Sequence, residues 1–212
     1  MTQGIDVSFY AIIDEDYVGA HDLGTCASEL VRAGASTIQY RAKNLPSKKF
    51  LLRALTLEGA ISGSGVPLII NDRTDIALLS GASGVHLGRE DVPVEKAREI
   101  LGPNRIIGVT VHGVEDALNA ELEGADYLGV GSIFPTSTKR NVPLIGLAGL
   151  KDIKASVKIP VVAIGGLTLE TIAQVVKAGA DGLAFISELW RGGEIGKRAR
   201  EIRAAIDSVR KG

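Results

Sequence analysis

Short apolar runs alternate with helical stretches along the chain, and the junctions between them repeat. At four places a helical stretch stops at a Gly-Ala pair, and an apolar run follows within a few residues. Glycine suits the left-handed turn that ends a helix, and the small side chain of alanine lets the next strand start close to it. The four pairs are Gly34-Ala35, Gly81-Ala82, Gly124-Ala125 and Gly179-Ala180.

Further apolar runs lie between these junctions and bring the number of expected strands to eight. Continuous apolar strands that alternate with helices are typical of a parallel sheet covered by helices. The expected strands are Phe9–Ile13, Thr37–Tyr40, Pro67–Ile70, Gly84–Leu87, Ile106–Val109, Tyr127–Val130, Pro160–Ile164 and Gly182–Ile186, with a last helix near Ile195–Val209. Eight such units in 212 residues predict a compact α/β fold, the (β/α)8 TIM barrel, whose chemistry belongs at the carboxyl ends of the strands.

Composition narrows the class of protein. Hydrophobic residues make up 45% of the chain and there are 26 glycines, enough for a large core and many tight turns. No linker or low-complexity tract divides the chain, so we expect residues 1–212 to form one domain. The net charge of −1 gives no general electrostatic reason to bind nucleic acid or an acidic membrane, although a local basic cluster could bind phosphate.

Cysteine content and the first residues narrow the class further. Cys26 is the only cysteine, which excludes an internal disulfide and a cysteine-rich metal site. The first residues show no basic segment followed by an apolar stretch, as a signal peptide would. No apolar run approaches the roughly 20 residues that cross a bilayer. We therefore expect a cytoplasmic protein, and the sequence leaves a homodimer open as its assembly state.

Polar side chains gather at the end of the second expected strand. Gln39, Arg41 and Lys43 alternate with other residues, so they share one face if the extended geometry continues. Such a face would be costly in a dry core but not at the open mouth of a barrel. Arginine offers a planar fork and lysine a mobile point charge, a suitable pair for a polyphosphate. The alternative is a solvated strand end with surface ion pairs.

Two aspartates follow the third and fourth expected strands. Asp72 comes after Asn71, and Asp91 follows the run that contains His86. Magnesium prefers a few hard oxygen ligands, completed by water and substrate phosphate, so the pair could hold Mg²⁺ beside a diphosphate. The alternative is that Asp72 makes a turn or caps the next helix, and that Asp91 caps the fourth helix. His86 is flanked by apolar residues and is interpreted as a satisfied interior histidine.

Two further regions point to phosphate binding. A long loop follows the sixth expected strand, begins near Gly131 and reaches about Gly146, longer than most barrel connections. It carries hydroxyls and Lys139, and its alternative interpretation is a polar solvent loop. Gly165-Gly166 and Ser187 follow the last two strands, where barrels often bind a monophosphate through backbone amides.

Taken in order, these motifs resemble the thiamine phosphate synthase family. The resemblance extends from about Tyr10 to Ser187, and each motif is short while the joint order is specific. The motifs are Gln39-x-Arg41-x-Lys43, Asn71-Asp72, Gly84 to Gly88 with Asp91, Gly131 to Lys139, Ile164 to Gly166, and Ile186-Ser187. The resemblance implies an enzyme, a transferase that joins hydroxymethylpyrimidine diphosphate to a thiazole phosphate and releases thiamine phosphate and diphosphate.

The resemblance also implies roles for individual residues. By this resemblance, the catalytic residues are Arg41, Lys43 and Lys139, and the ligands of Mg²⁺ are Asp72 and Asp91. Pyrimidine diphosphate contacts fall on Gln39, Tyr40, Arg41, Ala42, Lys43, Asn71, Thr110 and Lys139. Thiazole phosphate contacts fall on Thr136, Ser137, Thr138, Gly166, Ile186 and Ser187. Ala42 stands where an acidic residue is common, and Thr110 replaces the usual serine but keeps the hydroxyl.

The implied mechanism needs no protein nucleophile and no dedicated general base. The electron-rich aminopyrimidine stabilises a methylene cation when diphosphate departs, and the thiazole nitrogen attacks that cation without losing a proton. Magnesium and the three basic side chains would neutralise the departing charge.

Two alternatives come from other functional classes. A thiazole phosphate tautomerase would keep the monophosphate site but needs a proton-shuttling group, for which His112 is the candidate. A non-catalytic sensor of thiamine phosphates is the other alternative. Turnover of the two substrates separates all three.

Overall fold

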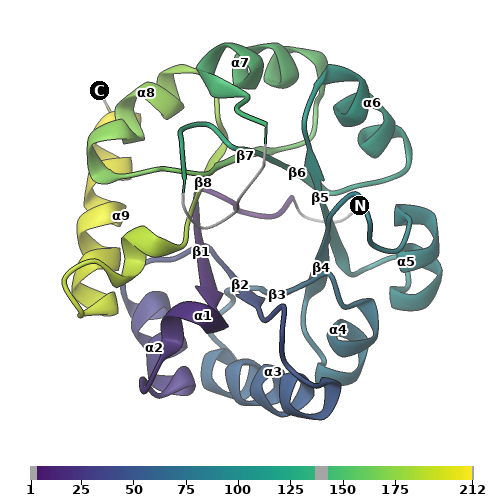
Figure 1. Cartoon of the computed structure of the whole chain (residues 1–212), viewed down its shortest axis with the longest axis vertical. Coiled ribbons are helices and arrows are strands. Elements are labelled where there is room, and N and C mark those ends of the chain that lie inside the picture. Colours follow the sequence, from purple (N-terminus) through teal and green to yellow (C-terminus); the bar gives the residue numbers. More distant parts are fainter. Residues whose placement is uncertain (1–3, 137–142, 212) are drawn as a thin grey trace.

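The structure is a computed structural model and describes residues 4–136 and 143–211. Within these residues, eight parallel strands pair in sequence order, and the last pairs with the first to close a barrel. Figure 1 shows the strands as a central ring with the helices arranged around it. The expected (β/α)8 barrel is confirmed. Among the described residues, no helix has the length and apolar character needed to cross a membrane.

The elements follow one another as repeated strand–helix units. The strands are β1 (Phe9–Asp14), β2 (Thr37–Arg41), β3 (Leu68–Asn71), β4 (Gly84–Leu87), β5 (Ile106–Val111), β6 (Tyr127–Val130), β7 (Val161–Ile164) and β8 (Gly182–Phe185). The helices are α1 (Glu15–Val18), α2 (Leu23–Arg32), α3 (Ser47–Ile61), α4 (Thr74–Ser80), α5 (Val94–Leu101), α6 (Val114–Leu122), α7 (Gly146–Ser156), α8 (Ile172–Lys177) and α9 (Ile195–Lys211), with short 3-10 helices at η1 (Leu169–Thr171) and η2 (Ser187–Trp190).

Several strands run further toward their carboxyl ends than their apolar runs predict. Asp14 pairs in register with Arg41, and Asn71 pairs with His86, so the backbone ladder continues into polar residues. The ladder depends on backbone groups rather than on side-chain polarity. At the other end, β3 begins after Pro67 because proline has no N–H to donate. The polar residues at the mouth are therefore held on strands.

The Gly-Ala junctions have the predicted backbone. Gly34, Gly81, Gly124 and Gly179 have φ values of +86°, +78°, +92° and +96°, in the left-handed region. A side chain at such a position is strained, which explains why glycine recurs there. Each turn reverses the chain between a helix and the strand that follows it.

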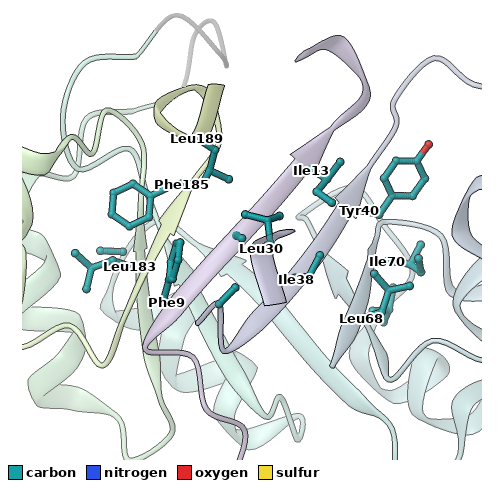
Figure 2. Close-up of a cluster of buried hydrophobic side chains, with 14 of the residues drawn as sticks. Phe9, Ile13, Leu30, Ile38, Tyr40, Leu68, Ile70, Leu183, Phe185 and Leu189 are labelled. Atoms are coloured by element: carbon teal, nitrogen blue, oxygen red, sulfur yellow. The ribbon is translucent and has the colours of Figure 1, made fainter. Parts of the chain in front are cut away.

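Each strand presents one set of side chains outward and the other inward. The outward set packs against the helices, and Phe9, Leu183 and Phe185 lie beside one another there in Figure 2. The inward set forms a smaller cluster that includes Tyr10 and Tyr127. The interior of the barrel is thus filled with side chains, which leaves a ligand to bind toward the ends of the strands.

Close contact between strands creates a requirement for glycine inside the barrel wall. A Cβ at Gly84, the first residue of β4, would lie 2.0 Å from the carbonyl oxygen of Ile106. We expect Gly84→Ala to lower the free energy of unfolding by about 1 to 3 kcal/mol, the usual range for overpacking. Gly59→Ala is the matched control, because Gly59 lies in α3 with no atom within 4 Å of its Cβ position.

The control substitution should raise the free energy of unfolding by about 1 kcal/mol through better helix propensity. Urea unfolding of both variants measures the difference. Equal stability of the two variants would contradict the close contact at Gly84.

Candidate functional site

A pocket of about 250 Å³ opens at the carboxyl end of the barrel. Its walls come from the last residues of several strands and from the residues that follow strands β2 to β8, as the fold predicts. Many residues proposed from sequence meet there, although they are far apart along the chain. Those that line the pocket are Lys43, Asn71, Asp72, Asp91, Thr110, Thr136, Gly166, Ile186 and Ser187.

A smaller cavity of about 30 Å³ lies deeper in the barrel. Gln39 and Arg41 line it, and Asn71 and Thr110 line both this cavity and the pocket. Gln39, Arg41 and Lys43 therefore lie one after another along the barrel axis, from the interior toward the carboxyl end. Gln39 and Arg41 are buried in the interior, while Lys43 reaches the open mouth.

A buried ion pair holds Arg41 in place. Its Nη1 atom donates to Oδ2 of Asp14, and the side chains are 11% and 1% exposed. Asp14 also accepts a hydrogen bond of 3.1 Å from the backbone amide of Asp16, at the start of α1. Sequence reasoning missed Asp14, although it ends the first apolar run in the same way that polar residues end the others. This carboxylate orients the guanidinium in the deeper cavity.

Asp72 and Asp91 lie next to each other at the pocket wall. Lys43 donates to the carboxylate of Asp72, and burial together with the neighbouring Asp72 carboxyl raises the pKa of Asp91 above its usual range. Asp72 has a positive φ of 65°, unusual for a residue with a side chain. Its amide donates to the carbonyl of His86 at 2.8 Å, which fixes this turn.

Neither aspartate caps a helix through its side chain. Arg73 is the N-cap residue of α4 and Pro93 that of α5, and no side-chain cap is present at either helix. The Asp91 carboxylate instead accepts a hydrogen bond of 2.7 Å from the amide of Gly88 and closes a tight turn. The capping interpretation is therefore wrong for both residues, while Asp72 lies at a bend after β3 and Asp91 closes a turn after β4.

The glycines after β7 allow the loop after β6 to pack against them. Gly165 and Gly166 have φ values of +97° and +66°. A Cβ on Gly166 would lie 2.6 Å from the carbonyl oxygen of Pro135. The amide of Phe134 donates to the carbonyl of Gly165 at 3.0 Å. This packing brings Thr136 and Gly166 to the same side of the pocket as Ser187.

Some residues proposed from sequence do not contribute side chains to the pocket. Tyr40 and Ala42 face the helices, where the Tyr40 hydroxyl donates to Glu15 at 2.7 Å. Strand alternation explains this, since they lie between the inward-facing residues of β2. Any substrate contact by these two residues is limited to their backbone. Ser137, Thr138 and Lys139 lie outside the described residues.

His86 is a satisfied interior histidine, as its apolar flanks predict. Its Nδ1 lies 3.0 Å from the hydroxyl of Tyr127, and its Nε2 lies 2.8 Å from Oγ1 of Thr110. Tyr127 was not singled out from sequence, because its hydroxyl meets His86 only across the closed barrel. His112 also lines the pocket, and its amide donates to Asp116 at 3.2 Å just before α6.

Comparison with known proteins agrees with this arrangement. Residues 9–189 match the family described as thiamine monophosphate synthase. The chain belongs to this family. The thiamine-phosphate synthase of Clostridium acetobutylicum is 43% identical and covers 93% of this chain and 94% of its own length. That of Pyrococcus horikoshii is 46% identical, covering 85% of this chain and 87% of its own.

A solved structure also matches over almost the whole chain. Thiamine phosphate pyrophosphorylase from Pyrococcus furiosus has a TM-score of 0.87 and 40% identity, and the match covers 97% of this chain and 98% of that one. The resemblance of the motifs to this family is confirmed.

The buried ion pair gives a stability test. Asp14→Asn keeps the shape of the side chain but leaves the Arg41 charge uncompensated, so we expect the free energy of unfolding to fall by about 3 kcal/mol. Glu99→Gln is the matched control, because Glu99 pairs with Lys96 on the surface with both side chains more than half exposed. An exposed pair contributes about 0.5 kcal/mol or less. Urea unfolding of both variants measures the two losses of free energy. Equal small losses would contradict a buried ion pair between Asp14 and Arg41.

Proposed function

We propose that this chain is a thiamine-phosphate synthase that couples hydroxymethylpyrimidine diphosphate with a thiazole phosphate. The observation that carries the proposal is one pocket with two kinds of wall. One wall presents Lys43 with the Asp72 and Asp91 carboxylates, and the other presents glycines with Thr136 and Ser187. The named relatives support the same activity.

The first wall suits the pyrimidine diphosphate. The carboxamide of Gln39 can pair with an aminopyrimidine edge, because it offers a donor and an acceptor side by side. The Nε atom of Arg41 is buried without a hydrogen-bond partner among the described residues, so the guanidinium retains a donor for an anion. Lys43 adds a mobile charge at the mouth. Lys139, outside the described residues, takes the same role by resemblance to the family.

The residues present fit a magnesium ion. Among the described residues, no group of three or more His, Cys, Asp or Glu side chains could hold a metal. The proposal therefore assigns two protein ligands, Asp72 and Asp91, whose carboxyls lie next to each other. Two carboxylates with substrate phosphate and water are a normal ligand set for Mg²⁺. Burial and the neighbouring Asp72 carboxyl raise the pKa of Asp91, and a cation bound between the two carboxylates would favour the ionised form of both. Magnesium would supply charge neutralisation to the diphosphate.

The second wall suits the thiazole phosphate. Gly166 leaves backbone close to the pocket, and Ser187 adds a hydroxyl at the start of η2. The next residue, Glu188, is buried and paired with Arg198 of α9, so its charge is compensated behind the phosphate wall. Thr136 completes this wall, and Ser137 and Thr138 join it by resemblance.

The chemistry proposed for the pocket is an ionisation followed by capture. The bond between the methylene carbon and the diphosphate oxygen breaks, and both electrons leave with the diphosphate. Arg41 and Lys43 stabilise that developing charge, an electrostatic form of catalysis. The lone pair of the thiazole nitrogen then forms the new bond to the methylene carbon. The protein orients the two reactants and excludes other nucleophiles.

The proposal extends to where the reaction takes place. Both substrates are charged phosphate esters, which do not cross a membrane unaided, so we place the enzyme in the cytoplasm with them. No nucleic acid or membrane partner is part of the proposal, and a homodimer stays open.

Chelation of magnesium should abolish most turnover and leave thiazole phosphate binding largely intact. The reason is that Asp72 and Asp91 lie on the diphosphate wall, away from Gly166 and Ser187. A coupling assay with both substrates, before and after chelation and re-addition of Mg²⁺, measures the first effect, and calorimetric titration of thiazole phosphate measures the second. Full activity in chelator would refute the metal role. Isomerisation of the thiazole with no coupling would identify a tautomerase, and binding without turnover would identify a sensor.

Replacing the pyrimidine methyl group by trifluoromethyl should slow the chemical step far more than it weakens binding. An electron-withdrawing group destabilises the proposed cation, so its effect is selective for the transition state. Single-turnover rates measured beside substrate affinity separate the two. A nearly unchanged chemical step would favour concerted displacement over ionisation while leaving the synthase activity in place.

A further inference from the structure

Five polar side chains form a continuous hydrogen-bonded chain across the barrel interior. Nε2 of Gln39 donates to the hydroxyl of Tyr10 at 2.9 Å, and that hydroxyl lies 2.7 Å from the hydroxyl of Tyr127. Tyr127 lies 3.0 Å from Nδ1 of His86, and Nε2 of His86 lies 2.8 Å from Oγ1 of Thr110. The chain begins in the deeper cavity and ends at a residue that lines the pocket.

With the Gln39 amide donating to Tyr10, one direction along the chain gives the buried Tyr10 proton an acceptor, because in the opposite direction that hydroxyl would accept from both Gln39 and Tyr127. Tyr10 accepts from the Gln39 amide, so its own proton is available for Tyr127. Tyr127 then accepts from Tyr10 and donates to Nδ1 of His86, which must carry a lone pair. A neutral imidazole with a lone pair on Nδ1 carries its proton on Nε2. That proton goes to Oγ1 of Thr110, so the hydroxyl proton of Thr110 is left to donate elsewhere.

Two glycines on neighbouring strands leave space for the rings of this hydrogen-bonded chain. A Cβ on Gly108 would lie 2.1 Å from the Tyr127 ring, and a Cβ on Gly129 would lie 2.9 Å from the His86 ring. Tyr10 and Tyr127 are each 1% exposed. Burial raises the pKa of both phenols above their usual range, so both stay protonated and able to donate. A buried chain of this kind is stable only if every member is satisfied.

We propose that Tyr127 is a positioning residue that holds His86 as the Nε2–H tautomer and thereby makes the Thr110 hydroxyl a donor toward the bound pyrimidine diphosphate. With the opposite tautomer, Thr110 would have to donate to Nε2 and would present only a lone pair to an anionic substrate. The Nε2–H tautomer of His86 therefore lets the Thr110 hydroxyl donate a hydrogen bond to the anionic substrate. The identity of the substrate rests on the proposed function, whereas the tautomer of His86 does not.

Nitrogen NMR of protein labelled with ¹⁵N-histidine tests the tautomer without catalysis. The chain has three histidines, and the His86 signals are assigned by their loss in His86→Asn. We expect the wild-type protein to show a protonated, pyrrole-type Nε2 and an unprotonated, pyridine-type Nδ1. In Tyr127→Phe the two shifts should move toward each other as the second tautomer becomes populated. A proton on Nδ1 in the wild type, or unchanged shifts in the variant, would overturn the proposal.

A double-mutant cycle tests whether Tyr127 acts through Thr110. We expect Tyr127→Phe to lower kcat roughly tenfold in the wild-type background, the effect of one hydrogen bond, and by less than about twofold when Thr110 is already valine. Equal effects in both backgrounds would show that Tyr127 serves only the packing of the barrel, and would overturn the proposal.

Thr37→Val is the matched control background for this cycle. Thr37 is a buried threonine on β2, and its hydroxyl donates to the carbonyl of Asp6 at 2.7 Å, away from the chain of five side chains. Tyr127→Phe should keep its full effect on kcat in that background. If no coupling activity is found at all, the proposed function fails while the wild-type NMR spectrum still decides the tautomer.

Discussion

The alternation of side chains along closed parallel strands is the constraint on which the rest of this structure depends. Because the barrel has no free edge, each strand residue faces either the helices or the interior. On β2 this separates Tyr40, which packs outward, from Gln39 and Arg41, which point into the deeper cavity. The same alternation places apolar residues around the barrel and polar residues inside its carboxyl end.

Burial then determines what those interior polar groups must do. Arg41 is accompanied by Asp14, and His86 is bonded at both ring nitrogens, since an unpaired polar group in this environment is costly. The same pairing orients the groups that face the pocket. The hydrogen bonds that satisfy the buried polar side chains therefore also orient the side chains that face the pocket. Gly108 and Gly129 leave space for this arrangement.

The local features of the fold were predictable because they depend on neighbours in the chain. The Gly-Ala junctions require only a left-handed residue between a helix and a strand, and the apolar runs require only burial. The short helices α1, η1 and η2 were not predicted, because so few residues carry no periodic pattern. For Asp72 and Asp91, sequence chemistry left a metal site and a helix cap equally open, and only the positions of Arg73 and Pro93 excluded the cap.

The sequence by itself determined the eight strand–helix units, the polar residues at the strand ends and the family to which they belong. Each of these follows from residues close together in the chain or from the order of short motifs. Only the tertiary structure decided which polar groups meet. Tyr10 and Tyr127 are 117 positions apart, and Asp14 and Arg41 are 27 apart, yet each pair is in contact. Such contacts arise from closure of the barrel and from strand register, and no local pattern contains either one.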